Sequence, residues 1–179
     1  MFLLERLDHT LKKLKSQIAN FLTLTNLSLG GFAICFIILD KPHMSLVFIF
    51  LAALLDRYDG MTARKLNIVS DLGKQLDSMS DLISFGAAPA FLLYQGVLHK
   101  FGGPGAFFTI LFLAMGAVRL SKFNLQENTS YFSGLPIPAA GIVVTLSYLL
   151  IGKIPDFAFM FIILIFAILM VTPFRMKKI

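Results

Sequence analysis

Residues 56–81 of this 179-residue chain are DRYDGMTARKLNIVSDLGKQLDSMSD, and this stretch determines how the rest of the sequence is interpreted. It holds five of the ten acidic residues, although it lies between long apolar segments. Asp56 and Asp59 are three positions apart, and Asp77 and Asp81 are four positions apart. Residues at these spacings share one face of an α-helix. The pattern therefore predicts two helices, each directing a pair of carboxylates towards one common point.

Residues with little or no side chain accompany the carboxylates. Gly60 and Ala63 continue the first acidic face, and Gly73 precedes Asp77 by one helical turn. A ligand could lie against the bare backbone at such positions. Arg64 adds a permanent cation that is suited to phosphate oxygens. These residues predict a second occupant beside the carboxylates.

Four carboxylates close to lipid need a compensating charge. Insertion scales assign each Asp a cost of roughly 2.5–3.5 kcal/mol at a helix centre, and like charges one turn apart also repel each other. Two divalent cations held by oxygen ligands are the simplest compensation, and Mg²⁺, Mn²⁺ and Ca²⁺ all accept such ligands. The alternatives are ordinary loop charges between two membrane helices, or a cation path without chemistry. Loop charges, however, would not need this helical phasing.

Composition predicts an integral membrane protein of one domain. Hydrophobic residues make up 57% of the chain, the mean hydropathy is +0.81, and 19 residues are Phe. The net charge of +6 suits anionic lipid head groups, whereas nucleic-acid binding would be an unusual use of it in so apolar a chain. Cys35 is the single cysteine, so an intramolecular disulfide is excluded.

The expected fold is all-α, with six transmembrane helices preceded by an amphipathic helix. In residues 1–19 apolar side chains recur at helical spacing and basic side chains lie off that stripe, which is typical of a helix in the membrane interface. Residues 20–179 would form the membrane domain. Its six apolar segments are each close to the roughly 20 residues that span a bilayer. We place them near 20–39, 44–64, 74–98, 105–124, 135–152 and 156–173.

The distribution of Lys and Arg predicts the orientation in the cell membrane. In this arrangement Lys41, Lys100 and Lys153 fall on one side, and the remaining basic residues of the 16 fall on the other. The more basic side is expected to be cytoplasmic. Both termini and the acidic stretch would then face the cytoplasm.

The acidic stretch resembles a known family signature. The pattern Asp56-x2-Asp59-Gly60-x2-Ala63-Arg64-x8-Gly73-x3-Asp77-x3-Asp81 is similar to the signature of the CDP-alcohol phosphotransferase family. Eight positions at fixed spacing make this match highly specific. The resemblance implies attack of an alcohol on the lipid-side phosphate of a CDP-linked donor, with CMP as the leaving group. It also implies a homodimer.

The resemblance assigns roles by position in the motif. Asp56, Asp59, Asp77 and Asp81 would be ligands of two divalent cations, Mg²⁺ or Mn²⁺ with Ca²⁺ as a further option, and Asp81 would also be the general base. The resemblance also implies a set of residues that contact the CDP or CMP portion of the donor: Asp59, Gly60, Ala63, Arg64, Gly73 and Asp77.

Four stretches outside the signature resemble the family members that use L-serine as the acceptor and CDP-diacylglycerol as the donor. They are residues 20–26, 84–90, 119–124 and 134–140. Many relatives have Ala-Arg where this chain has Ser121-Lys122, so the cation is kept and the guanidinium fork is not. Candidates for binding the acceptor or a phosphate are Arg119, Lys122, Ser84 and Asn124.

Two other functions are compatible with the same carboxylates. Glycerol 3-phosphate or an inositol phosphate could replace serine as the acceptor, although each would require a more basic pocket. A divalent-cation transporter would use the four carboxylates but leaves Gly60, Ala63, Arg64 and Gly73 unexplained.

Overall fold

The computed structural model describes residues 2–66, 71–125, 131–172 and 175–177, apart from the side chains of several helical and strand residues. Its helices are α1 (Phe2–Ile38), α2 (Pro42–Leu66), α3 (Asp71–Asp81), α4 (Ala88–Gly96), α5 (Gly103–Leu125), α6 (Ile137–Ser147) and α7 (Ala158–Val171). Three short helical turns complete them: the π-helix η1 (Leu82–Ala87) and the 3₁₀ turns η2 (Leu98–Phe101) and η3 (Tyr148–Leu150).

These elements agree closely with the apolar segments expected from the sequence. Because η1 joins α3 to α4 and η3 extends α6, the described residues form six long helical stretches, at the places where six were predicted. The interfacial helix expected over residues 1–19 and the first apolar segment form one continuous helix, α1, from Phe2 to Ile38. One antiparallel strand pair, β1 (Tyr131–Ser133) with β2 (Arg175–Lys177), was not predicted. The helical class is thus confirmed, with this small addition.

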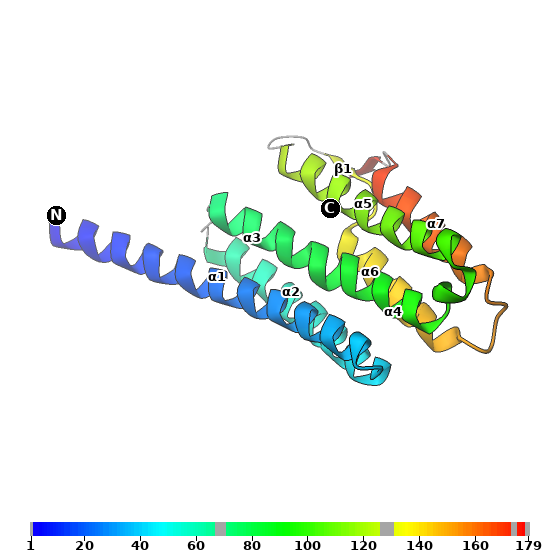
Figure 1. The fold of residues 1–179 in the computed structure, drawn as a ribbon. Coiled ribbons are helices and arrows are strands. Elements are labelled where there is room, and N and C mark those ends of the chain that lie inside the picture. Colours follow the sequence, from blue (N-terminus) through cyan, green and yellow to red (C-terminus); the bar gives the residue numbers. More distant parts are fainter. Residues whose placement is uncertain (1, 67–70, 126–130, 173–174, 178–179) are drawn as a thin grey trace.

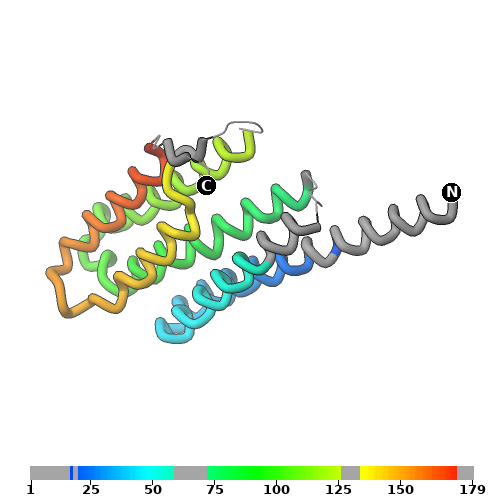
Figure 2. Tube along the Cα trace, turned by 180° about the vertical axis from the view of Figure 1, so that it is seen from behind, coloured from blue at the N-terminus to red at the C-terminus, as the bar shows by residue number. Residues whose placement is uncertain are grey.

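The long helix formed by α3, η1 and α4 runs through the middle of the molecule. Figure 1 shows α1 and α2 on one side of it, α5 and α7 on the other, and α6 behind it, and the reverse view in Figure 2 brings α6 to the front. Four consecutive residues of η1, from Ser84 to Ala87, are buried. The side chains of Phe85, Phe112 and Ile137 are fully buried around this point. The core is therefore centred on η1, directly after Asp81.

Two glycines allow neighbouring helices to approach the backbone of η1. A Cβ added at Gly30 of α1 would lie 2.8 Å from the Ser84 Cα, and one added at Gly141 of α6 would lie 2.8 Å from the Phe85 Cα. Real Cβ atoms do not come so close, so these positions have room only for glycine. The position of η1, and of Asp81 before it, is thus fixed from two sides.

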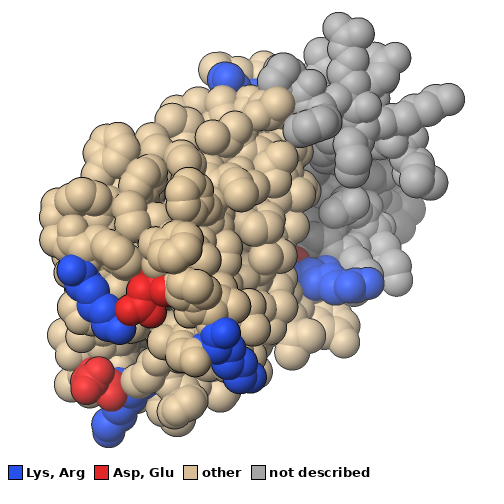
Figure 3. Space-filling view, turned by 90° about the vertical axis from the view of Figure 1, so that its right-hand side faces the viewer, with Lys and Arg blue, Asp and Glu red and all other residues tan. Residues whose placement is uncertain are grey.

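The outer surface is strongly apolar. Large hydrophobic side chains are exposed on several helices, including Ile38 (78%), Phe107 (62%) and Phe161 (59%). Two stretches, Asn20–Ile38 and Gly103–Leu125, are long and apolar enough to cross a membrane. In Figure 3, one face of the molecule shows only scattered charged side chains among uncharged residues. This surface suits lipid, since water-exposed proteins rarely leave so much large apolar area uncovered.

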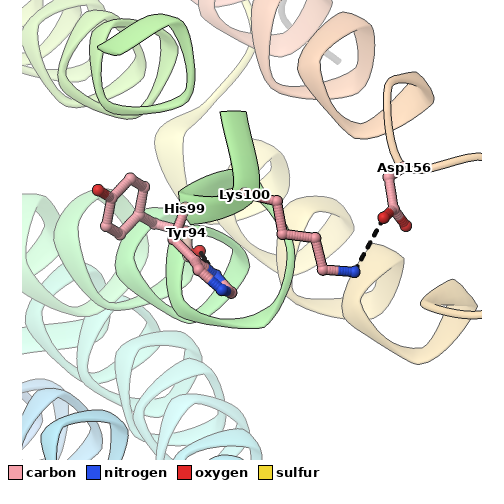
Figure 4. A network of polar contacts seen from close by, with 4 residues as sticks. All are labelled: Tyr94, His99, Lys100 and Asp156. Carbon is pink, nitrogen blue, oxygen red and sulfur yellow. Dashed lines mark hydrogen bonds and ion pairs between the residues drawn. The ribbon is translucent and has the colours of Figure 1, made fainter. Parts of the chain in front are cut away.

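At the end of the bundle away from Asp81, an ion pair links the α4–α5 connection to the segment before α7. The Lys100 Nζ lies 2.9 Å from an Asp156 carboxylate oxygen, and both side chains are exposed. The His99 Nδ1 lies 3.2 Å from the Tyr94 carbonyl oxygen (Figure 4). The Lys100–Asp156 contact joins residues 56 positions apart in sequence, whereas the His99–Tyr94 contact is local.

Candidate active site

Three of the predicted carboxylates meet between α2 and α3. Asp56 is on α2, and Asp77 and Asp81 are on α3. One carboxylate oxygen from each lies within 4.8 Å of those of the other two. Asp77 is exposed, Asp56 is half-buried and Asp81 is buried. The helical spacing that predicted a common face on α3 is confirmed, and so is the meeting of the two helices at Asp56.

The rest of the motif is only partly described. The backbone at Asp59, Gly60, Ala63 and Arg64 continues helix α2, but their side chains lie outside the described residues. Gly73 is half-buried on α3, one turn before Asp77. The predicted nucleotide contacts at these five positions remain predictions.

Asp81 is in an environment unfavourable for an isolated carboxylate. Its side chain is 8% exposed, and its Oδ1 has no hydrogen-bond partner among the described residues. Asp56 and Asp77, which carry the same charge, are its nearest acidic neighbours, and Asp56 is within hydrogen-bonding range. Arg119 is a neighbouring group of opposite charge. Burial and like-charge repulsion both oppose this arrangement unless a further positive charge is present.

The donor set fits divalent cations. All three side chains offer hard oxygen ligands, which Mg²⁺, Mn²⁺ and Ca²⁺ prefer. The buried Oδ1 of Asp81 has no donor among the side chains that the structure describes, as expected for an atom whose partner is a metal ion. The residues present are therefore compatible with the predicted metal site, with Asp59 as the fourth expected ligand.

Helix α5 places two cations differently. Arg119 is 8% exposed, its Nε has no hydrogen-bond partner among the described residues, and its Cζ lies 5.4 Å from the centroid of the Phe123 ring. Lys122, in the last turn, is exposed. Of the two predicted cations, the structure brings Arg119 to the carboxylates. Lys122 points to the outside of the bundle end, as expected for a residue that flanks a membrane helix.

The other two acceptor candidates form hydrogen bonds between helices. Ser84 is fully buried, and its hydroxyl donates to the Asn26 carbonyl oxygen of α1 over 3.1 Å. Asn124 donates from Nδ2 to the Ser78 Oγ of α3 over 2.9 Å. Ser84 thus links η1 to α1, and Asn124 links α5 to the residue that follows Asp77.

Two serines of α3 were missed in the sequence. Ser78 receives the Asn124 bond, and the Oγ of the fully buried Ser80 has no hydrogen-bond partner among the described residues. The burial of Ser80 could have been predicted from its spacing, because it precedes Ser84 by one helical turn on the same face. No sequence signal points to Ser78, since its partner is 46 residues away on another helix.

The sequence that forms these helices and carboxylates matches a family model. The chain belongs to the CDP-alcohol phosphatidyltransferase family, whose model matches residues 16–173. The match includes all six apolar segments and every residue of the acidic motif. The family resemblance inferred from residues 56–81 is thus confirmed.

Relatives within this family indicate a narrower group. The chain is 41% identical over 129 residues to the CDP-diacylglycerol–serine O-phosphatidyltransferase of Bacillus subtilis, covering 71% of this chain and 73% of that protein. It is 37% identical over 137 residues to the Helicobacter pylori enzyme of the same name, covering 75% of this chain and 58% of that protein. An archaetidylserine synthase of Methanothermobacter thermautotrophicus is 34% identical over 178 residues, covering 94% of this chain and 73% of that protein.

Proposed function

We infer that this chain is a phosphatidylserine synthase, which transfers the phosphatidyl group of CDP-diacylglycerol to L-serine and releases CMP. Support comes from family membership and from several relatives named for this reaction. The observation that carries the chemistry is the convergence of Asp56, Asp77 and Asp81 within 4.8 Å, with one buried oxygen of Asp81 that has no hydrogen-bond partner in the described part of the chain.

In the proposed reaction the serine hydroxyl oxygen attacks the phosphorus atom next to the lipid. A new oxygen–phosphorus bond forms, and the bond between that phosphorus and the bridging oxygen breaks, so that CMP leaves with the electron pair. Asp81 accepts the hydroxyl proton, because a neutral alcohol is a weak nucleophile and a positioned carboxylate can act as general base. Two divalent cations, held by Asp56, Asp59, Asp77 and Asp81, would neutralise the phosphate charge.

The remaining motif residues hold the donor in this proposal. Gly60, Ala63 and Gly73 leave room for the CMP part, together with Asp59 and Asp77. Arg64 binds phosphate oxygens through its guanidinium group.

The acceptor carboxylate is assigned to Arg119. Its burial and its position beside Asp81 support this role, since a guanidinium group can bind a carboxylate with two parallel hydrogen bonds. Lys122 contributes long-range attraction for the anionic substrates. Ser84 and Asn124 border the same pocket.

The proposal includes a placement in the membrane. The six long helical stretches cross the bilayer, residues 2–19 continue the first of them beyond the cytoplasmic side as part of the unbroken helix α1, and both termini and the acidic site face the cytoplasm. The protein acts as a homodimer. Exposed apolar side chains on several helices and two stretches long enough to cross a bilayer support this placement.

The test is CMP release by purified protein in detergent with CDP-diacylglycerol and Mg²⁺ or Mn²⁺. L-serine, glycerol 3-phosphate and inositol phosphate are supplied separately, and the lipid product is identified. We expect release that depends on serine and yields a serine lipid.

Each contrary result has a definite meaning. Release only with a phosphorylated acceptor would overturn the choice of serine and keep the metal chemistry. Turnover with a CDP-archaeol donor but not with CDP-diacylglycerol would change the lipid and keep the acceptor.

A further inference from the structure

A chain of two hydrogen bonds links α5 to α3 beside the carboxylates. The Asn124 Nδ2 donates to the Ser78 Oγ over 2.9 Å, and the Ser78 Oγ donates to the Lys74 carbonyl oxygen over 3.0 Å. Because the Ser78 proton is used within α3, the hydroxyl presents a lone pair to α5. Asn124 is thereby required to present its amide nitrogen rather than its oxygen.

The position of this link gives it a functional meaning. Ser78 directly follows Asp77, and Asn124 is on the helix that carries Arg119. The beginning of α3 and the end of α5 lie at the same end of the bundle (Figure 1). Deeper in the bundle the contacts between these two long helices are apolar, with Gly86 next to the Leu113 side chain and Gly116 next to Leu82. The Asn124–Ser78 bond, at the end of the bundle that holds the carboxylates, is a directional polar contact. It therefore defines the spacing of the two helices more closely than apolar packing alone.

We propose that Asn124 is a positioning residue, which sets through Ser78 the distance between the carboxylates of α3 and Arg119 of α5. This proposal rests on the proposed function, because the space whose width it sets is the one assigned to the acceptor. It gives Asn124 a role different from direct contact with serine.

Two features favour positioning over direct binding. One of the two N–H groups of the Asn124 amide is bound to Ser78, which fixes the orientation of the side chain towards α3. Both partners are also uncharged and half-buried, so the bond persists at any salt concentration, unlike an exposed ion pair. The binding of the acceptor carboxylate is thus left to Arg119.

The test is a double-mutant cycle with Asn124→Ala, Ser78→Ala and the double variant. Loss of one hydrogen bond of this kind corresponds to a factor of about five. We expect each single variant to raise the KM for serine about fivefold. In the double variant the KM for serine should also rise about fivefold rather than about 25-fold, since both substitutions remove the same hydrogen bond. The KM for CDP-diacylglycerol and the metal concentration for half-maximal activity should stay at wild-type values, because the motif on α2 and α3 is intact.

Three controls isolate the link between the helices. Ser28→Ala removes the same kind of bond within a helix, from Oγ to the Leu24 carbonyl oxygen at 2.8 Å, on an exposed face. Ser121→Ala removes an exposed hydroxyl one turn before Asn124. Both should behave as wild type. Ser78→Thr keeps the hydroxyl, so its KM for serine should equal that of the wild type, unlike the KM of Ser78→Ala.

Several outcomes would overturn the proposal. These are additive effects in the double variant, a rise in KM for Asn124→Ala but not for Ser78→Ala, or no change in either. A fall in thermal stability together with an equal rise in the KM for serine and the KM for CDP-diacylglycerol would also contradict it. That pattern would indicate a general loss of packing. If the wild type uses a different alcohol, the proposed function fails, and the same cycle with that alcohol still decides the role of Asn124.

Discussion

The two ends of the helical bundle differ in how their charged side chains are arranged. At one end, Asp56, Asp77 and Asp81 bring three like charges within 4.8 Å, and one of them is buried. At the other end, Lys100 and Asp156 form a pair of opposite charges at 2.9 Å, and both remain exposed. The exposed pair needs nothing further from the protein, whereas the acidic cluster is unfavourable by itself.

This contrast separates charges kept for function from charges that support the fold. Isolated exposed ion pairs contribute about 0–1 kcal/mol to folding. A buried group of like charges costs stability and persists where another species compensates it. The difference predicts that substitutions at the acidic end change activity and ligand response, while those at the other end change neither.

The largest effect is expected for Asp81→Asn. The amide has nearly the same shape but cannot accept the hydroxyl proton, and general-base catalysis is worth about 10²–10⁴ in rate. We expect CMP release to fall at least about 1000-fold, while CDP-diacylglycerol still binds. CMP release and binding of the labelled donor are measured on the same preparation. Normal turnover in this variant would show that another group removes the proton.

A smaller effect, on stability, is expected from divalent cations. A ligand that binds only the folded protein stabilises it by about 2.7 kcal/mol at 100 times its Kd. Mg²⁺ or Mn²⁺ should therefore raise the unfolding temperature, and a chelator should lower it. The Asp77→Asn variant should lose most of this response, and Asp156→Asn should keep it. Equal responses in the two variants would place the cation outside the acidic cluster.

Much of the fold could be predicted because the signals are local. Apolar runs of bilayer length and turn residues between them located the six helical stretches. The continuity of α1 through residue 20 could not be predicted, because a change from an amphipathic to an apolar pattern does not require a break in the backbone. The pairing of β1 with β2 also could not be predicted, since the paired residues are more than 40 positions apart in sequence.

The candidate site divides in the same way. Asp77 and Asp81 were predictable from their spacing on one helix, and Asp56 from its spacing to Asp59 on the preceding helix. The partners of Ser84 and Asn124 were not, because the hydrogen bonds that orient them join helices far apart in sequence. The π-turn after Asp81 likewise depends on tertiary packing, with Gly30 and Gly141 against its backbone.

That packing allows a test of the acidic end that changes no charge. A Cβ at Gly30 would lie 2.8 Å from the Ser84 Cα and 3.0 Å from its nitrogen, whereas a Cβ at Gly31 would meet nothing within 4 Å. Gly30→Ala should therefore cost about 1–3 kcal/mol, a typical overpacking penalty, and should also lower CMP release by moving the turn next to Asp81. Gly31→Ala, one residue along the same helix, should leave both unchanged. Thermal unfolding and CMP release are measured for both variants, and equal losses would exclude a specific role for the contact with η1.

The smallest effect is expected at the opposite end, with Lys100→Ala and Asp156→Ala. Each should lower the free energy of unfolding by less than about 1 kcal/mol, because exposed ion pairs contribute little and salt screens them. The double variant should lose no more than the single variants, and CMP release should equal that of the wild type in all three. Unfolding at low and high salt checks the electrostatic origin of any loss. A fall in CMP release in these variants would mean that the connection between α4 and α5 is coupled to the acidic site along α5, and the two ends would then no longer be independent.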